Sequence, residues 1–259
     1  MEKFSSIKIL PDDIIFQKPE RIRRPFSWVE HIPFAFKLIE VLSPNIIVEL
    51  GTHSGNSFCA FNQAIKMLNL PSKCFAIDTW EGDKHSGQYE SSVFNDLFEY
   101  CKVHYSQTAI LIKKSFDEAV EDFQNDSIDL LHIDGLHTYE AVSNDFYNWL
   151  PKLSTKSVVL FHDIEVYEGD FGVYRFWKEI KVKYPSIEFL FGNGLGILFV
   201  VENISTKEKG KLLEYKSNEL VIKMFSMQGK LIQAKSESDE LNKEIESLRE
   251  YNSLLFSML

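Results

Sequence analysis

The chain has 259 residues, of which 44% are hydrophobic and 25% are charged, so it can form one large α/β domain with an accessory piece and is not disordered throughout. Acidic side chains outnumber basic ones by 38 to 28, and nearly all of this excess lies in the first 200 residues. A nucleic-acid enzyme needs a basic surface to displace counterions from phosphates, so the charge argues against DNA or RNA as a partner.

Targeting and disulfide signals are missing from the sequence. It contains no run of about 18 apolar residues, and its first residues lack an apolar signal core. The cysteines Cys59, Cys74 and Cys101 are odd in number and have no CxxC spacing, which argues against a disulfide framework and a structural zinc site. We therefore expect a reduced, cytoplasmic protein without a membrane span.

In chain order, residues 1–44 predict an N-terminal arm followed by a helix, which ends where Pro44 precedes the first strand. A catalytic α/β domain is expected over residues 45–202, where short apolar runs alternate with segments of helical length. The runs predict strands at 45–50, 74–78, 109–112, 128–134 and 157–162, and the segments predict helices at 56–69, 90–104 and 138–150.

Two further apolar runs, 187–191 and 195–201, are joined by a Gly-Asn-Gly turn, which predicts an antiparallel hairpin. Strands that alternate with crossover helices form a mostly parallel sheet. The fold class predicted is therefore α/β, with a Rossmann-like, seven-stranded, mostly parallel sheet and helices on both faces.

The first strand runs into a turn that contains Gly51 and Gly55 and then into a helix. Glycines at such a turn let the backbone approach a ligand closely, and the helix offers free N–H groups. The second strand ends at Asp78, where an acid can hold the ribose hydroxyls of a nucleoside, or can simply organise a turn. The spacing is neither Gly-x-Gly-x-x-Gly nor a P-loop, which argues against nicotinamide, flavin or nucleoside triphosphate.

Three segments carry a family resemblance. Residues 48–57 (VELGTHSGNS) resemble the first motif of class I S-adenosylmethionine-dependent methyltransferases, and in particular the branch of macrocin-type sugar O-methyltransferases and cephalosporin-hydroxylase-like proteins. Residues 76–83 (AIDTWEGD) and 128–140 (IDLLHIDGLHTYE) resemble the second-strand and fourth-strand motifs of that branch. The resemblance covers roughly residues 45–201.

This resemblance implies a binding site for S-adenosyl-L-methionine. Glu49, Gly51 and Gly55 would surround the methionine part, and Asp78 would bind the ribose. Trp80, Ser115 and Phe116 would flank the adenine, although both aromatic side chains also suit ordinary core packing. The full set implied is Glu49, Gly51, Thr52, Ser54, Gly55, Ser57, Asp78, Thr79, Trp80, Ser115, Phe116 and Asp134.

A sugar hydroxyl is a poor nucleophile at neutral pH, so a base or a Lewis acid is expected beside it. The resemblance implies that Asp134 and Asp163, at the ends of two strands, hold a divalent cation such as Mg²⁺. It also implies that His137 is the catalytic base, with Asp134 beside it. His162 departs from the acidic or amide residue of the family, and it is interpreted as a third metal ligand, a second base or a cap of the sheet edge.

Two other histidines are interpreted differently. His132 lies inside the fourth strand and is expected to be a hydrogen-bonded core residue. His53 lies within the glycine turn and faces either the substrate or solvent.

Residues 215–259 have the apolar pattern of one long helix and not of alternating strands and helices. Apolar residues recur at spacings of four and three along one helical stripe: Leu220, Met224, Met227, Leu231, Ala234, Leu241, Ile245, Leu248, Leu255 and Leu259. This heptad pattern predicts self-association through a coiled coil, first as a parallel dimer and second as a trimer, because Ile at a and Leu at d favour two strands. The alternative is a lone amphipathic helix packed on the domain. The pattern reaches the last residue, which predicts a longer polypeptide with further C-terminal domains.

The function expected is O-methyl transfer to a sugar hydroxyl of a glycan or a glycosylated small molecule, as in polysaccharide biosynthesis. One alternative is transfer to a small phenolic or amine acceptor. Another is a catalytically inactive scaffold on a coiled coil, against which Asp78 and the pair Asp134 and His137 argue.

Overall fold

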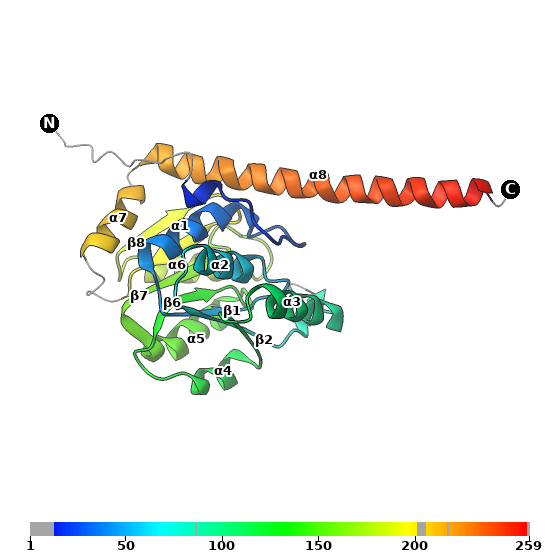
Figure 1. Cartoon of the computed structure of the whole chain (residues 1–259). Helices are drawn as coiled ribbons and strands as arrows, with labels where there is room; N and C mark the ends of the chain where they lie inside the picture. Colours follow the sequence, from blue (N-terminus) through cyan, green and yellow to red (C-terminus); the bar gives the residue numbers. More distant parts are fainter. Residues whose placement is uncertain (1–12, 86, 201–205, 217, 258–259) are drawn as a thin grey trace.

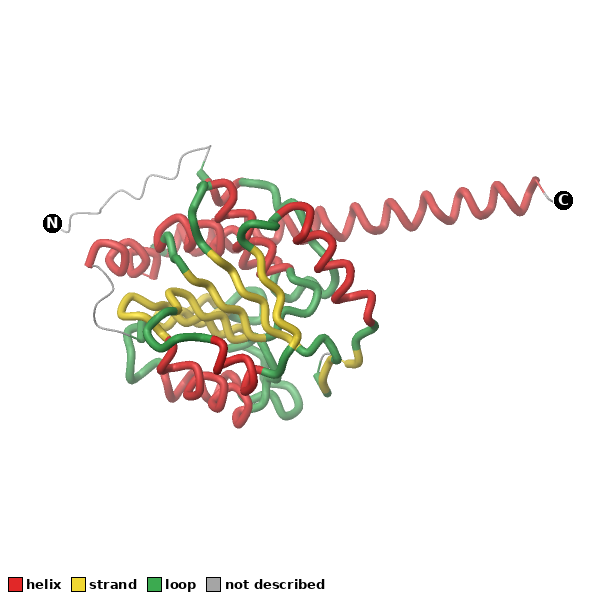
Figure 2. The backbone as a smooth tube through the Cα atoms, turned by 60° about the horizontal axis from the view of Figure 1, so that its bottom comes forward, coloured by secondary structure: helices red, strands yellow, loops and turns green. Residues whose placement is uncertain are grey.

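The computed structural model describes residues 13–85, 87–200, 206–216 and 218–257. Its main sheet has seven strands in the order β5-β2-β1-β6-β7-β9-β8 (Figure 2). The strands are β1 (Ile46–Leu50), β2 (Lys73–Asp78), β5 (Ala109–Lys113), β6 (Ile128–Ile133), β7 (Leu153–His162), β8 (Ser186–Phe189) and β9 (Leu195–Leu198). The first five are parallel, and β9 is antiparallel to both β7 and β8. The predicted Rossmann-like sheet with its terminal hairpin is therefore confirmed.

Helices cover both faces of this sheet (Figure 1). One face packs against α1 (Ile32–Leu42), α2 (Asn56–Met67) and α3 (Ser91–His104). The other packs against α4 (Phe116–Ala119), α5 (Tyr139–Trp149) and α6 (Val173–Ile180). Successive side chains of a strand point to opposite faces, so Ile47 joins the first core and Val48 the second. Burial on both faces explains why the strands read as continuous apolar runs.

Short elements complete the chain. Strands β3 (Gly82–Asp83) and β4 (Gly87–Gln88) form a small hairpin after β2. Single 3₁₀ turns lie at Ile14–Phe16, Val29–His31, Val120–Asp122 and Leu150–Lys152.

The segment before α1 is tied to the core, and we call residues 18–31 the N-terminal strap. Arg21 has a buried guanidinium that donates to the carbonyl of Ser54 at 3.0 Å and to Asp96 at 2.8 Å. The side chain of Asn56, at the start of α2, bonds the backbone of Arg23 and the carbonyl of Pro25. The strap therefore lies against the turn that follows β1.

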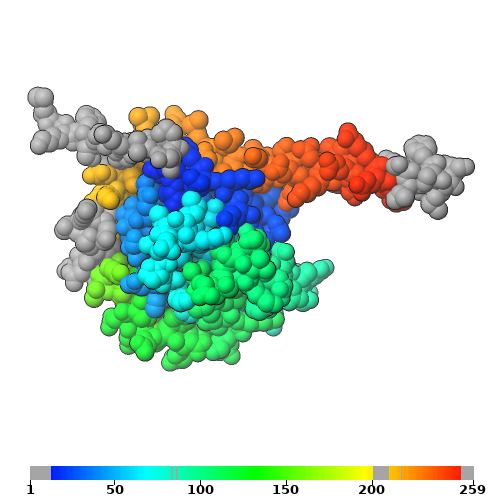
Figure 3. All heavy atoms as spheres, in the orientation of Figure 1, coloured from blue at the N-terminus to red at the C-terminus, as the bar shows by residue number. Residues whose placement is uncertain are grey.

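Two helices follow the sheet, α7 (Thr206–Lys216) and the long α8 (Glu219–Ser257). The first half of α8 packs on the domain through Val221, Phe225 and Ile232, which are buried. Its Gly229 lies so close to the strap that a Cβ there would come within 2.7 Å of the Cα of Glu30. The second half stands away from the body of the molecule (Figures 1 and 3).

Apart from Met224, which is half-buried against the domain, the predicted coiled-coil stripe of α8 is not the stripe that faces the domain. Leu220, Met227 and Leu231 are 79%, 67% and 63% exposed, and the stripe continues through exposed Leu241 and Leu248. At about 100° per residue, this stripe and the domain-facing one lie on nearly opposite sides of the helix. Helix α8 therefore packs on the domain and still presents a separate apolar stripe. The side chains of Leu255 and Leu259 lie outside the described residues.

No helix in the described part of the chain is long and apolar enough to cross a membrane.

Candidate active site

A cavity of about 410 Å³ opens at the carboxyl ends of β1, β2, β6 and β7, the edge where ligands bind in this class of sheet. It brings together residues that are distant in sequence. The predicted site residues that line it are Gly51, Thr52, Asp78, Thr79, Ser115, Phe116, Asp134, His137, His162 and Asp163.

Glu49, Ser54, Gly55, Ser57 and Trp80 are also predicted site residues, but they do not line this cavity. Glu49 points toward the α1–α2 layer and is fully buried. Trp80 is buried against Phe94, and its indole N–H donates to the carbonyl of His53. These residues support the glycine turn from the side that faces away from the cavity. Their predicted contact with the cofactor stays a prediction.

Gly51 allows two loops to meet at the bottom of the cavity. Its φ is +85°, a conformation that side chains disfavour, and an added Cβ would come within 2.8 Å of the Cα of Gly135. The N–H of Asp134 donates to the carbonyl of Leu50 at 2.8 Å. The glycine turn after β1 and the loop after β6 are thus in direct backbone contact.

Asp78 organises that turn. Its carboxylate accepts N–H groups from Thr52 and His53, each at 2.9 Å, and from Trp80 at 2.7 Å. An ionised carboxylate has about four lone-pair sites, so one further donor, such as a ribose hydroxyl, can still bind. Both interpretations made for Asp78, turn organisation and ligand binding, are compatible with this geometry.

Ser115 and Phe116 line the cavity beside the loop after β6. Ser115 is the N-cap of α4 and forms a reciprocal capping box with Glu118. The ring of Phe116 packs against Gly135, where a Cβ would come within 3.0 Å of its Cζ. The cap therefore fixes the start of α4 and, with it, the position of the ring.

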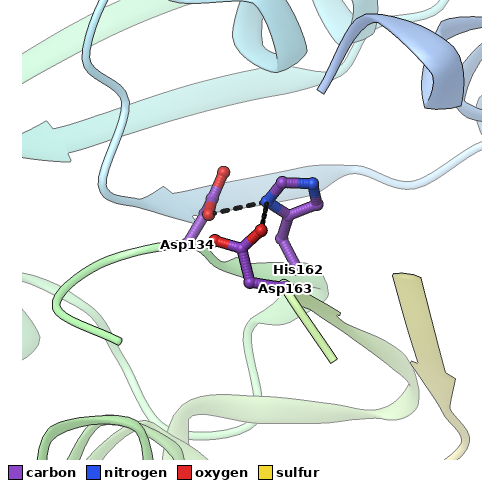
Figure 4. A group of neighbouring side chains, drawn as sticks. All are labelled: Asp134, His162 and Asp163. Carbon is purple, nitrogen blue, oxygen red and sulfur yellow. Dashed lines mark hydrogen bonds and ion pairs between the residues drawn. The ribbon is translucent and has the colours of Figure 1, made fainter. Parts of the chain in front are cut away.

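Two carboxylates and an imidazole converge at the other side of the cavity (Figure 4). His162 Nδ1 lies 3.1 Å from Asp134 Oδ1 and 3.3 Å from Asp163 Oδ1. Its Nε2 lies 3.2 Å from the carbonyl of Gly192, which can only accept a proton, so in the neutral ring the lone pair of Nδ1 faces the acids. Asp163 Oδ1 is buried and makes no hydrogen bond within the described residues.

This donor set fits a divalent cation. One potential ligand atom from each of the three residues lies within 4.8 Å of the others. A metal-ligating histidine usually donates its other N–H to a carbonyl or carboxylate, as His162 does to Gly192. The two carboxylates suit Mg²⁺ or Mn²⁺, whereas the imidazole nitrogen suits Zn²⁺ and other transition-metal ions.

His137 lies beside these acids. Its Nε2 is 2.9 Å from Asp163 Oδ2 and 3.5 Å from Asp134 Oδ1. Burial opposes its protonation, but the two carboxylates outweigh burial and raise its pKa to about 10. The same balance raises the pKa of His162 to about 9 and holds the pKa values of both acids below their usual range. Without a cation, two protonated histidines therefore balance two carboxylates.

His85 and Phe171 are among the residues that line the cavity but were not predicted from the sequence. His85, in the β3–β4 hairpin, has its Nε2 2.6 Å from Asp170 Oδ1, and its ring lies 4.4 Å from that of Phe171. Lys84 pairs with the same carboxylate. These contacts join the hairpin to the loop after β7. No local motif signals them, because the partners are 85 residues apart.

His132 has the structural role expected of it. It is fully buried, its Nε2 accepts the indole N–H of Trp28 at 3.1 Å, and its Nδ1 lies 2.9 Å from Glu49 Oε1. The indole fixes the proton on Nδ1, which donates to the carboxylate. This chain joins the N-terminal strap to the strand that leads into the glycine turn.

The sheet order and the cavity at its carboxyl edge define a class I methyltransferase fold. Residues 48–164 match a family described as a methyltransferase domain.

Two relatives resemble the chain in sequence. An uncharacterized protein of Sinorhizobium fredii, y4gI, is 46% identical over 173 residues, which make up 67% of this chain and 19% of that protein. An uncharacterized protein of Acanthamoeba polyphaga mimivirus, R132, is 29% identical over 126 residues, or 46% of this chain and 52% of that protein. The chain thus spans about a fifth of one relative and about half of the other.

Solved structures share the fold at low identity. CalS11, a calicheamicin methyltransferase, superposes with a TM-score of 0.55 at 15% identity, over 69% of this chain and 80% of its own. A putative caffeoyl-CoA O-methyltransferase from Staphylococcus aureus gives 0.52 at 14%, over 65% and 81%. The S-adenosylhomocysteine-bound methyltransferase PaMTH1 of Podospora anserina gives 0.51 at 12%, over 65% and 77%.

Proposed function

We propose that this protein transfers a methyl group from S-adenosylmethionine to a hydroxyl of a sugar, in a glycan or a glycosylated small molecule, with a divalent cation assisting. One observation carries the proposal. The glycine turn with Asp78 and the cluster of Asp134, His137, His162 and Asp163 line the two sides of one cavity. A methyl donor on the first side would lie next to a base on the second.

The cofactor side supplies binding groups. Gly51 and Thr52 offer backbone close to the methionine part, and Asp78 has one lone-pair site left for the ribose. Phe116 offers a ring face for the adenine. A structure of the same fold that holds S-adenosylhomocysteine supports the choice of cofactor.

The acceptor side supplies proton transfer. The acceptor oxygen forms a bond to the methyl carbon while the carbon–sulfur bond breaks and its electron pair stays on sulfur. The hydroxyl proton leaves to His137 Nδ1, which has no hydrogen-bond partner within the described residues, while Nε2–H donates to Asp163 and orients the ring. His137 accepts that proton only in its neutral form, whereas the two carboxylates favour the protonated form. When bound by Asp134, His162 and Asp163, a divalent cation supplies a positive charge that favours neutral His137 and acidifies the acceptor hydroxyl.

Polar groups on the acceptor side favour a sugar. Ser27 and Asn193 line the cavity and can bond hydroxyl groups. A phenolic acceptor is the second candidate, because one structure of the same fold is named as a caffeoyl-CoA O-methyltransferase.

Cofactor binding is tested by titration calorimetry with S-adenosylhomocysteine. We expect micromolar affinity, and we expect Asp78→Ala to weaken it by roughly 1.5–3 kcal/mol, the scale of hydrogen bonds to a charged group. Asp122→Ala, which removes an exposed carboxylate that pairs with Lys114, is the control. No binding heat, or a preference for a nicotinamide dinucleotide, would contradict the proposal.

Turnover is tested with p-nitrophenyl glycosides, a catechol and a primary amine as acceptors, following S-adenosylhomocysteine release with and without chelator. Methylation of a glycoside that chelator abolishes supports the full proposal. Full activity in excess chelator removes the cation from it. Methylation of the catechol or the amine alone overturns the sugar acceptor, and cofactor binding without transfer to any of them indicates a scaffold.

We further propose that α8 pairs with a second copy as a parallel two-stranded coiled coil. The exposed stripe through Leu231, Leu241 and Leu248 supports this, because the domain already uses the other side of the helix. Light scattering should show a dimer for the chain and a monomer for a truncation after Glu240 or for Leu241→Glu/Leu248→Glu. The truncation keeps Phe225 and Ile232 buried. A monomeric full chain refutes the proposal, and a trimer corrects its number of strands.

A further inference from the structure

A second cavity, of about 580 Å³, lies between the N-terminal strap and α8. Its lining consists of Arg24, Pro25, Phe26, Ser27, Glu30, His53, Gly192, Asn193, Gln233 and Glu237. Four of these, Pro25, Ser27, His53 and Asn193, also line the first cavity. The two cavities therefore adjoin, and a ligand can extend from one into the other.

The junction lies on the acceptor side. None of Asp78, Thr79, Ser115 or Phe116, which line the cofactor side, reaches the second cavity. Gly192, which does reach it, accepts a hydrogen bond from His162 through its carbonyl. A molecule that leaves the acid–histidine cluster along the shared residues therefore meets the strap and α8.

The lining suits a neutral molecule with many hydroxyl groups. Glu30 and Glu237 repel phosphate, and the charge of Arg24 is already paired with Glu240 at 2.8 Å. Glu30 Oε2 is buried and makes no hydrogen bond to any described residue, so it can accept one from a hydroxyl. Gln233 has an amide that can both donate and accept. Pro25 and Phe26 add apolar surface, as small-molecule sites commonly do.

Helix α8 holds its share of this lining in place. Its buried residues Phe225 and Ile232 lie on the domain, and the pair of Arg24 with Glu240 joins it to the strap beyond the cavity. Gln233 donates to Glu237 at 2.9 Å, one helical turn along. The polar groups are therefore positioned before a ligand arrives, which lowers the entropy cost of binding.

We propose that the second cavity is a subsite for a further sugar unit of an oligosaccharide acceptor, with Gln233 and Glu237 of α8 as its hydrogen-bonding groups. This rests on the proposed function, since it presupposes a sugar acceptor. Helix α8 then has two roles on its two sides, acceptor selection and self-association.

The test compares a p-nitrophenyl monosaccharide that the enzyme methylates with p-nitrophenyl disaccharides that extend it by one unit. We expect the best disaccharide to have a kcat/KM about tenfold higher, the worth of one or two hydrogen bonds. Gln233→Ala/Glu237→Ala should reduce that ratio to near one. Glu246→Ala, which removes an exposed carboxylate farther along α8, should keep it. Melting temperature and S-adenosylhomocysteine affinity are measured for each variant to detect misfolding.

A disaccharide preference that survives in the double variant overturns the subsite, and so does a wild-type enzyme with no such preference. A uridine diphosphate hexose that outperforms every neutral disaccharide overturns the charge argument and the subsite with it. If S-adenosylhomocysteine binds but no glycoside is methylated, the proposed function itself has failed, and the subsite fails with it.

Discussion

The two sides of the cavity are built in different ways. On the cofactor side, backbone N–H groups of Thr52 and His53 hold the carboxylate of Asp78, and the conformation of Gly51 sets the wall. On the acceptor side, the side chains of His137, His162 and the two neighbouring acids hold one another through ion pairs.

The shape of the cofactor side and the charge of the acceptor side therefore depend on different interactions. The cofactor side is held by backbone N–H groups on one carboxylate, whereas the acceptor side is held by four titratable side chains that also respond to cations. Binding of the methyl donor and transfer of the methyl group should therefore fail independently.

The largest effect is expected for His137→Ala. Loss of the base should lower turnover by about 10²–10⁴-fold, the usual worth of general base catalysis, while S-adenosylhomocysteine affinity stays within about twofold. Steady-state kinetics and calorimetry measure the two quantities. His104→Ala, which removes an exposed histidine of α3, is the control. If affinity and turnover fall together, the two sides of the cavity are not independent.

The second effect concerns the cofactor side. Gly51→Ala places a Cβ against the backbone of Asp134 and Gly135, and we expect cofactor affinity to fall about 100-fold, since a shifted wall loses several hydrogen bonds. Gly169→Ala is the matched control, because its φ is also positive, at +55°, but its Cβ would have open space. Equal losses of affinity in both variants would mean that backbone strain, and not the close approach of the two loops, is responsible.

The same difference governs what the sequence could predict. Gly51 and Asp78 lie in local motifs, and Asp134 and Asp163 lie at the ends of strands that were predicted to be parallel, so their meeting at one edge could be expected. His85 with Asp170, and Arg24 with Gln233 and Glu237, meet only through the tertiary fold, and no local spacing signals them. The family resemblance implies that Trp80 flanks the adenine; in the structure it packs against Phe94 and does not line the cavity, so its contact with the cofactor stays a prediction.

For helix α8 as well, the sequence predicts only part of the packing. Its periodic leucines and methionines indicate the exposed stripe, while the stripe that packs on the domain includes Gly229 and is hard to recognise. The close approach to the backbone of Glu30 needs that glycine. A pattern of apolar residues therefore predicts the helix but not which side faces the domain.

The smallest effect is a pH dependence of stability confined to the acceptor side. His137 and His162 have pKa values near 10 and 9 in the folded, cation-free protein against an ordinary value of 6.5, so their contribution is complete below pH 6.5 and is lost as pH rises through 9 to 10. In chelator, the melting temperature should fall between pH 6.5 and 10 by on the order of 5 °C more in the wild type than in His137→Gln. Adding Mn²⁺ should reduce this slope, because the cation replaces the two protons. Parallel melting curves for wild type and variant would show that the histidines do not carry the charge that balances Asp134 and Asp163.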